Sequence, residues 1–192
     1  MNWYEKLSEY FPIEEMKSRE HMEALLNDKH NIYLKEEGPH HVLMFVETET
    51  FIFIDYLFVS AQSRGAGIGR KLLNSLKQKG KPIILEVEPV DYEDTDTEKR
   101  LRFYARENFH HARRIGYSRR SLATGEQNDM EILFWSPEDA DEESVYEAMK
   151  MTYEDIHTYK DETFYGEPYD PAEKVLVFTT QKKKCILEPY LP

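Results

Sequence analysis

Residues 51–80 constrain the fold of this chain most, because an apolar strand, a glycine-rich turn and an amphipathic helix follow one another directly there. Residues 51–59 are apolar except for Asp55, a pattern typical of a strand that is covered on both faces. The turn after this strand has Gly65, Gly67 and Gly69 at alternate positions, which lets the backbone turn tightly and present its N–H groups. The turn therefore lies at a predicted helix N-terminus, where free N–H groups and the helix dipole favour an anion.

The spacing of these glycines excludes two well-known phosphate loops. A P-loop requires G-x-x-x-x-G-K followed by Ser or Thr, and a dinucleotide-binding turn requires G-x-G-x-x-G. Residues 64–69 instead read R-x-x-G-x-G. Because glycine turns also occur for structural reasons alone, this motif is informative only together with the strand before it and the helix after it.

The composition predicts one soluble globular domain. A length of 192 residues is enough for one well-buried domain, and 40% hydrophobic with 32% charged residues argue against a disordered or membrane chain. We expect a cytoplasmic protein and no membrane partner, because no apolar run is long enough to cross a membrane and the first thirty residues are too acidic for a signal peptide. The single cysteine, Cys185, excludes an internal disulfide.

The formal net charge of −12 bears on the partners of the protein. Nucleic-acid binding relies on Lys and Arg side chains at phosphates, so we expect no nucleic-acid partner. An acidic field attracts a cationic substrate such as an amine, but net charge also serves solubility alone. The charge therefore favours an amine only slightly.

Hydrophobic spacing predicts further elements on both sides of the central stretch. Those before it are one or two helices within 3–29, strands over 31–35 and 42–46, and a turn over 36–39. The strand over 42–46 is expected to form an antiparallel hairpin with 51–59. A strand over 83–88 is expected to run parallel to 51–59, because a helix joins the two. An acidic loop over 91–98 then contains a capping box, Thr95 to Glu98, that begins the next helix.

The last third of the chain predicts a strand pair, a long helix and a final strand. The strand pair spans 110–117 and 130–135, around the polar segment 118–129. Ser136 and Pro137, followed by acids, predict the start of the helix, and Gly166 begins the stretch that breaks it. The apolar face of this helix carries Val145, Met149, Thr152, Ile156 and Tyr159. The final strand is expected over 175–180.

A second motif, F-Y-x-x-x-N-F at residues 103–109, follows the predicted βαβ unit. With R-x-x-G-x-G before it, the chain resembles the GNAT superfamily of acyl-CoA N-acetyltransferases, whose signatures are Q/R-x-x-G-x-G/A and F-Y-x-x-x-G-F. Asn108 stands where the family usually has glycine, and Asn is the next-best residue for a left-handed helix C-terminus. The resemblance covers residues 13–135.

The resemblance implies an α/β (α+β) fold with a mixed, mostly antiparallel central sheet, a parallel βαβ unit and helices on both faces. Residues 1–135 would form the GNAT-like domain and residues 136–192 a C-terminal extension of helix, loop and strand. The apolar face of this extension must be buried on its own domain, on a second subunit or over the acceptor cleft. The acids within 138–143 and the aromatic loop 164–169 would suit a wall for a cationic acceptor.

The resemblance also implies acetyl-CoA as co-substrate and a set of binding residues. The backbone that would hold the pyrophosphate belongs to Arg64, Gly65, Ala66, Gly67, Ile68, Gly69 and Arg70. Backbone N–H groups of Leu57, Phe58 and Val59 would polarise the thioester carbonyl. Tyr104 occupies the position whose tyrosine commonly protonates the departing thiolate of coenzyme A in this family. Its helical spacing from Leu101 also allows a simple core role.

An amine must lose a proton before it attacks a carbonyl, so the chain needs a base. The candidates are Glu86, Asp55 and Glu88. Asp55 is an acid within an apolar strand, where burial is costly unless the group is paired or used. Glu86 and Glu88 point to one face of their strand, with Glu86 nearer the sheet centre. We rank Glu86 first and Asp55 second, and read Glu88 as a solvated acid at the strand end.

Other constellations are less informative. No metal site is expected, because the adjacent histidines at 40–41 and 110–111 point to opposite faces of a strand. The basic cluster of Arg113, Arg114, Arg119 and Arg120 fits either the 3′-phosphate of coenzyme A or a solvated surface.

The leading hypothesis is an N-acetyltransferase in which the amine of a small molecule or a peptide attacks acetyl-CoA directly. The alternative is a catalytically silent acyl-CoA-binding sensor on the same fold. A third hypothesis is a scaffold that forms a homodimer through the C-terminal helix. The sequence does not identify the amine.

Overall fold

The computed structural model describes residues 1–90, 95–121, 123–139 and 141–191. The α-helices are α1 (Trp3–Ser8), α2 (Arg19–Asp28), α3 (Ile68–Lys77), α4 (Thr95–Arg106), α5 (Glu142–Thr152), α6 (Asp161–Tyr165) and α7 (Ala172–Val175). The strands are β1 (Tyr33–Gly38), β2 (His41–Glu47), β3 (Ile52–Val59), β4 (Ile83–Val87), β5 (His110–His111), β6 (Ile115–Arg120), β7 (Gln127–Trp135) and β8 (Leu176–Phe178). Short 3-10 turns lie at Ile13–Glu15, Ala61–Ser63 and Glu188–Tyr190, and α5 continues as a π-helix over Tyr153–His157. Within these ranges, no helix has the length and apolar character needed to cross a membrane.

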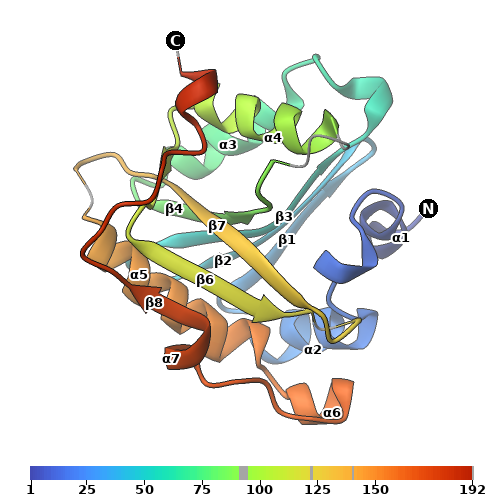
Figure 1. Cartoon of the computed structure of the whole chain (residues 1–192). Helices are drawn as coiled ribbons and strands as arrows, with labels where there is room; N and C mark the ends of the chain where they lie inside the picture. The colour runs from blue at the N-terminus through green and yellow to red at the C-terminus, as the bar shows by residue number, and fades with distance from the viewer. Residues whose placement is uncertain (91–94, 122, 140, 192) are drawn as a thin grey trace.

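The strands form one mixed sheet in the order β1-β2-β3-β4-β7-β6-β8, with β5 paired to β7. β3 and β4 run parallel, as predicted for strands joined by a helix, and the other pairs are antiparallel. Figure 1 shows α3 and α4 over one face of the sheet and α2 and α5 over the other. The predicted mixed, mostly antiparallel sheet with a parallel βαβ unit and helices on both faces is confirmed.

Each face of the sheet has its own apolar core. On one face, Leu72, Leu73 and Leu76 of α3 pack with the neighbouring strands, because their helical spacing places them on one side of the helix. On the other face, α1, α2 and α5 bury residues such as Leu25 and Met149 against the sheet. Phe53 of β3 and Ile84 of β4 belong to one core and Ile54 and Leu85 to the other, so both faces of this strand pair are packed.

The two parallel strands separate after a short ladder. β3 and β4 pair only from Ile52 with Ile83 to Ile54 with Leu85, although β3 continues to Val59 and β4 to Val87. On the other side of β3, the register with β2 shifts so that Asp55 has no partner residue. Such a bulge increases the local twist of a strand and is common beside functional sites. The separation opens a gap in the sheet directly after Asp55.

The C-terminal segment packs on the same sheet. β8 pairs with β6, and Val145, Met149 and Ile156 are buried in the core with the residues of α1 and α2. The expected apolar face of the helix is therefore covered within the chain. The expected start at Ser136 and Pro137 is wrong: α5 begins at Glu142, because Asp141 supplies the side-chain cap to the N–H of Ser144.

The boundaries of several other elements also differ from the prediction. β1 runs to Gly38 rather than ending at 35, because its whole length pairs with β2, and the turn shrinks to residues 39–40. β6 and β7 extend into the polar segment 118–129, since ladder hydrogen bonds do not require apolar side chains. β8 starts at Leu176 because α7 occupies the residues before it. Thr95 lies inside α4 rather than at its cap, and residues 91–94 of the expected acidic loop lie outside the described residues.

Candidate active site

A cleft of about 570 Å³ opens where β3 and β4 separate. Its walls come from the glycine turn and the start of α3, from β3, β4 and α4, and from the N-terminal segment around Tyr10 to Lys17. Arg119 of β6 and Met130 of β7 also line it. The cleft therefore joins the glycine turn to the acidic residues of the sheet, two features that lie far apart in the sequence.

The glycine turn has the backbone geometry that the sequence predicts. Gly65 and Gly67 have φ values of 85° and 78°, which are left-handed conformations that favour glycine, and Gly67 is the N-cap of α3. A Cβ atom at either position would meet no atom within 4 Å, so both glycines face open space. Gly69 allows close packing instead, because a Cβ atom there would lie only 3.1 Å from the ring of Phe103.

The turn leaves N–H groups available to a ligand. The N–H groups of Arg64 and Ala66 are already used, donating to the carbonyls of Ala61 and Ser63. Within the described ranges, no partner is found for the N–H groups of residues 67–70, which open α3. These N–H groups and the helix dipole make an anion site at one end of the cleft. Of the seven residues predicted here, Ala66 does not line the cleft.

The residues predicted on β3 divide between its two faces. Leu57 and Val59 line the cleft. Phe58 points away and packs against Tyr10, with ring centroids 5.7 Å apart. This alternation follows from the two-residue repeat of a strand. The backbone of all three residues lies beyond Ile54, where β3 has no ladder with β4.

Tyr104 lies on α4 and lines the cleft, although its residue is only 8% exposed. Burial raises the pKa of its hydroxyl well above the usual value, so the phenol stays protonated. No hydrogen bond from this hydroxyl is found among the described residues, while its ring packs against Phe109. The helix ends as predicted, with Asn108 in the left-handed conformation at φ 60°. Tyr104 is thus a buried residue whose hydroxyl remains available as a proton donor.

The similarity of this chain to known proteins bears on its family. No family model matches it. A solved structure described as a putative acetyltransferase from the GNAT family of Bacteroides thetaiotaomicron has the same fold, with a TM-score of 0.63 at 22% identity over 85% of this chain and 90% of that chain. The Bacillus subtilis (strain 168) protein named "Putative acetyltransferase YjbC" is 65% identical over 189 residues, 98% of each chain. The chain belongs to the GNAT superfamily of acetyltransferases.

Membership in the GNAT superfamily confirms the resemblance carried by the two sequence motifs. The protein is an acetyltransferase, like its 65% identical relative. The comparisons do not identify the acceptor of the acetyl group. Within the described residues, no group of three or more metal-ligating side chains is found.

Glu86, ranked first as the base of this GNAT enzyme, is tightly held. Its carboxylate accepts hydrogen bonds from His157 Nε2 at 2.7 Å, Tyr117 Oη at 2.9 Å and Arg119 Nε at 3.3 Å. Burial alone would raise the pKa of Glu86, but His157 and Arg119 outweigh burial and hold it well below the usual range. A carboxylate with such a low pKa is a weak proton acceptor. The geometry therefore argues against Glu86 as the base.

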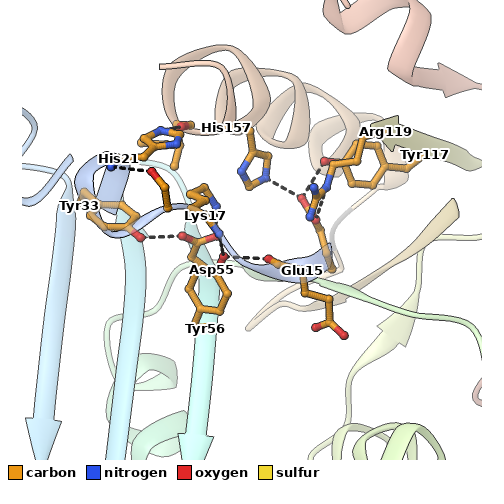
Figure 2. A network of polar contacts seen from close by, with 12 residues as sticks. Glu15, Lys17, His21, Tyr33, Asp55, Tyr56, Tyr117, Arg119 and His157 are labelled. Carbon is orange, nitrogen blue, oxygen red and sulfur yellow. Dashed lines mark hydrogen bonds and ion pairs between the residues drawn. The ribbon is translucent and has the colours of Figure 1, made fainter. Parts of the chain in front are cut away.

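Asp55, ranked second, is also fully engaged. Its two oxygens lie 2.6 Å from Lys17 Nζ and 2.6 Å from the hydroxyl of Tyr33. Figure 2 shows that Lys17 and Tyr33 both point to this carboxylate. Burial lowers the pKa of Lys17, with Asp55 opposing that shift. The pair keeps two buried charges satisfied, as a polar group in such a strand requires.

A third carboxylate, Glu15, lies in the cleft and was missed in the sequence. Burial raises its pKa to about 7, although Arg100 opposes this shift and the nearby Glu88 adds to it. Arg100 lies between the two acids, with Nη1 3.4 Å from Glu15 and Nη2 3.7 Å from Glu88. Glu88 is thus an ion-paired residue of the cleft, rather than the freely solvated acid expected.

Glu15 is held over the cleft by a tyrosine of the sheet. Tyr56 donates its hydroxyl to the carbonyl of Glu15 at 2.9 Å and accepts from the N–H of Lys17 at 2.9 Å. Glu15 Oε1 is buried and has no hydrogen-bond partner within the described part of the chain. No sequence pattern marks Glu15, because it lies in a short turn whose position depends on a contact with β3, 41 residues away.

The structure separates the four arginines of the predicted basic cluster. Arg113 donates to the carbonyl of Lys183, Arg114 lies over the ring of Phe178, and Arg120 pairs with Glu167. Arg119 alone lines the cleft. The aromatic loop 164–169 does not line it either, because Tyr165 bonds to Ser18 and His21 of the N-terminal region. His157 of the C-terminal segment contacts the cleft indirectly, because it hydrogen-bonds to the cleft residue Glu86.

Proposed function

We propose that acetyl-CoA lies across the gap between β3 and β4 and that an amine in the same cleft attacks its thioester directly. One observation carries this proposal: a single cleft connects the unused N–H groups of the α3 N-terminus to Tyr104 and to Glu15. The pyrophosphate would lie at residues 67–70, where the helix dipole and four N–H groups favour negative charge. The backbone of Leu57, Phe58 and Val59 would face the thioester carbonyl.

The glycine turn is tested by Gly67→Asp. The new side chain would enter the open space beside the N-cap and bring a negative charge toward the pyrophosphate. We expect the Kd for acetyl-CoA, measured by calorimetry, to rise about 10- to 100-fold. Gly80→Asp is the matched control, because Gly80 also has a positive φ of 69° and open space but lies beyond the other end of α3. Equal Kd values for the two variants would refute the turn as the pyrophosphate site.

Tyr104 is proposed as the acid that protonates the departing thiolate. Its raised pKa keeps the proton on the phenol until a thiolate forms beside it. Tyr104→Phe keeps the ring and its packing on Phe109, so we expect kcat to fall about 10- to 1,000-fold while the Kd for acetyl-CoA holds. Tyr10 also lines the cleft and supplies the comparison. A larger loss of kcat in Tyr10→Phe than in Tyr104→Phe would move the acid to Tyr10.

Glu15 is proposed as the base, in place of Glu86 and Asp55. A base works best when its pKa lies near the working pH, and a carboxyl with a pKa of about 7 meets that condition. Arg100 and Glu88 would position it, and its free Oε1 would accept the proton of the amine. Glu86 and Asp55 would keep their charges and hold in place the side chains that bind to them.

The sequence also allowed a catalytically silent acyl-CoA sensor. A sensor needs the glycine turn, but it has no use for a buried carboxyl poised near neutral pH beside the cleft. That observation favours the enzyme.

The cytoplasmic location and the oligomeric state stay predictions. Light scattering of the purified chain measures the oligomeric state directly. We expect a monomer, because the apolar face of α5 is buried in its own core.

A further inference from the structure

Arg119 has more hydrogen-bond donors than the protein uses. A guanidinium carries five N–H donors in a planar fork. The side chain of Arg119 is only 9% exposed, and its Nε donates to Glu86. Among the described residues, no acceptor is found for its Nη1 or Nη2 atoms, and the residue lines the cleft. Neither Nη atom is among the buried atoms of the described residues that lack a partner, so these four donors lie at the surface of the cleft, where they are available to a ligand.

The neighbouring carboxylates are already satisfied. Glu86 accepts from Tyr117 and His157 in addition to Arg119. Asp55 is bonded to Lys17 and Tyr33. The unused fork of Arg119 therefore has no further anion of the protein to bind, and the ligand must supply the acceptor atoms.

The floor of the cleft is balanced in charge. Lys17 and Arg119 contribute two cations, and Asp55 and Glu86 contribute two carboxylates. Although the chain as a whole carries a formal charge of −12, this floor gives a lone ammonium ion no excess of negative charge. An acceptor that carries one positive and one negative group preserves the balance, and its carboxylate matches the planar fork of an arginine.

We propose that the acceptor is a small molecule with a carboxylate beside its amine, as in a free α-amino acid, and that Arg119 binds this carboxylate. The inference rests on the proposed acetyl transfer and adds the class of acceptor to it. The apolar Phe53 and Met130 lie in the same cleft and can contact the side chain of such a molecule. Peptide N-termini are excluded as preferred acceptors, because their neighbouring carboxyl is an uncharged amide.

The test uses matched acceptors. Thiol release from acetyl-CoA is measured with each of the common L-amino acids, with the corresponding amino-acid amides and with the decarboxylated amines. For the best substrate, we expect kcat/KM of the acid to exceed that of its amide by at least about ten-fold in the native protein. In Arg119→Gln this ratio should fall by about the same factor. Comparing the ratio between proteins cancels the different amine pKa values of acid and amide.

Two further variants keep the test interpretable. Arg120→Gln changes the next residue of β6, which pairs with Glu167 outside the cleft, and should leave the ratio unchanged. Arg119→Lys retains the positive charge beside Glu86 but lacks the fork, so it should lose most of the preference even if Arg119→Gln fails to fold. Calorimetry with acetyl-CoA checks that each variant is folded and still binds acetyl-CoA.

The possible outcomes distinguish a failure of this inference from a failure of the proposed acetyl transfer. An unchanged ratio in a folded Arg119 variant, or acetylation of amines but of no carboxylate-bearing acceptor, overturns the inference and leaves acetyl transfer intact. Absence of acetyl-CoA binding, or of thiol release with every amine, overturns the proposed function, and the inference fails with it.

Discussion

Glu15→Gln is expected to lower kcat by about 100- to 10,000-fold, because it removes the proposed base while preserving the shape of the side chain. In the native protein the base works only when it is deprotonated, so kcat should rise with pH around the Glu15 pKa of about 7. In the variant this rise should disappear and leave only a rise at higher pH, where the amine itself loses its proton. The measurement is kcat against pH at saturating acetyl-CoA and acceptor.

Two neighbouring substitutions make the assignment to Glu15 specific. Glu14→Gln changes the adjacent carboxylate, which does not line the cleft, and should leave the pH profile unchanged. Glu88→Gln removes a negative charge that raises the pKa of Glu15, so the rise in kcat should move to lower pH. A native-like profile in Glu15→Gln would contradict the assignment and return the role to Glu86 or Asp55.

Removal of residues 136–192 is expected to leave a chain that does not fold. Among the apolar side chains that this segment buries almost completely in the core are Val145, Met149, Ile156, Val175 and Leu176. At about 1.5–3 kcal/mol for each buried side chain, their loss is comparable with the roughly 5–15 kcal/mol that stabilises a whole domain. We therefore propose that residues 1–135 and 136–192 form one folding unit. Circular dichroism and solubility of the fragment 1–135 provide the measurement.

Two methionines on α5 test, in the full chain, whether the C-terminal segment is part of the folding unit. Met149 is 0% exposed and Met151 is 47% exposed, so their truncation to alanine should differ sharply. We expect Met149→Ala to lower the free energy of unfolding by about 2–5 kcal/mol and Met151→Ala to change it by less than about 0.5 kcal/mol. A soluble 1–135 fragment that unfolds cooperatively and binds acetyl-CoA would instead show that the segment is an addition to a complete domain.

The sequence predicted the centre of the fold well, because the signals there are local. An apolar strand, three glycines and a leucine-spaced helix follow one another from Phe51 to Gly80, and the structure has β3, the turn and α3 in those places. The parallel pairing of β4 followed from the length of the helix between the strands. The start of α5 was misplaced because Ser136 and Asp141 both carry capping side chains, and only the packing of α5 on the sheet selects the second.

The acids of the site were harder to predict, because their roles depend on residues far away in the chain. Glu86 has an apolar-strand context like that of Asp55, and nothing local shows that His157, 71 residues later, will hold its carboxylate. Glu15 carries no periodic signal at all, and its raised pKa comes from burial and from the nearby Glu88, against the opposing effect of Arg100. The alternation of Leu57 and Phe58 across the strand, by contrast, follows from strand geometry and could have been assigned from the sequence.

Thiol release from acetyl-CoA, measured with the purified full chain over a panel of amines, amino acids and peptides, tests acetyl transfer most directly. The account predicts that coenzyme A is released in step with the appearance of an N-acetylated product, identified by mass spectrometry, for at least one acceptor. The rate should fall in Tyr104→Phe and Glu15→Gln. Tight binding of acetyl-CoA with no release above spontaneous hydrolysis for any acceptor would contradict the account and show that the protein is an acyl-CoA sensor.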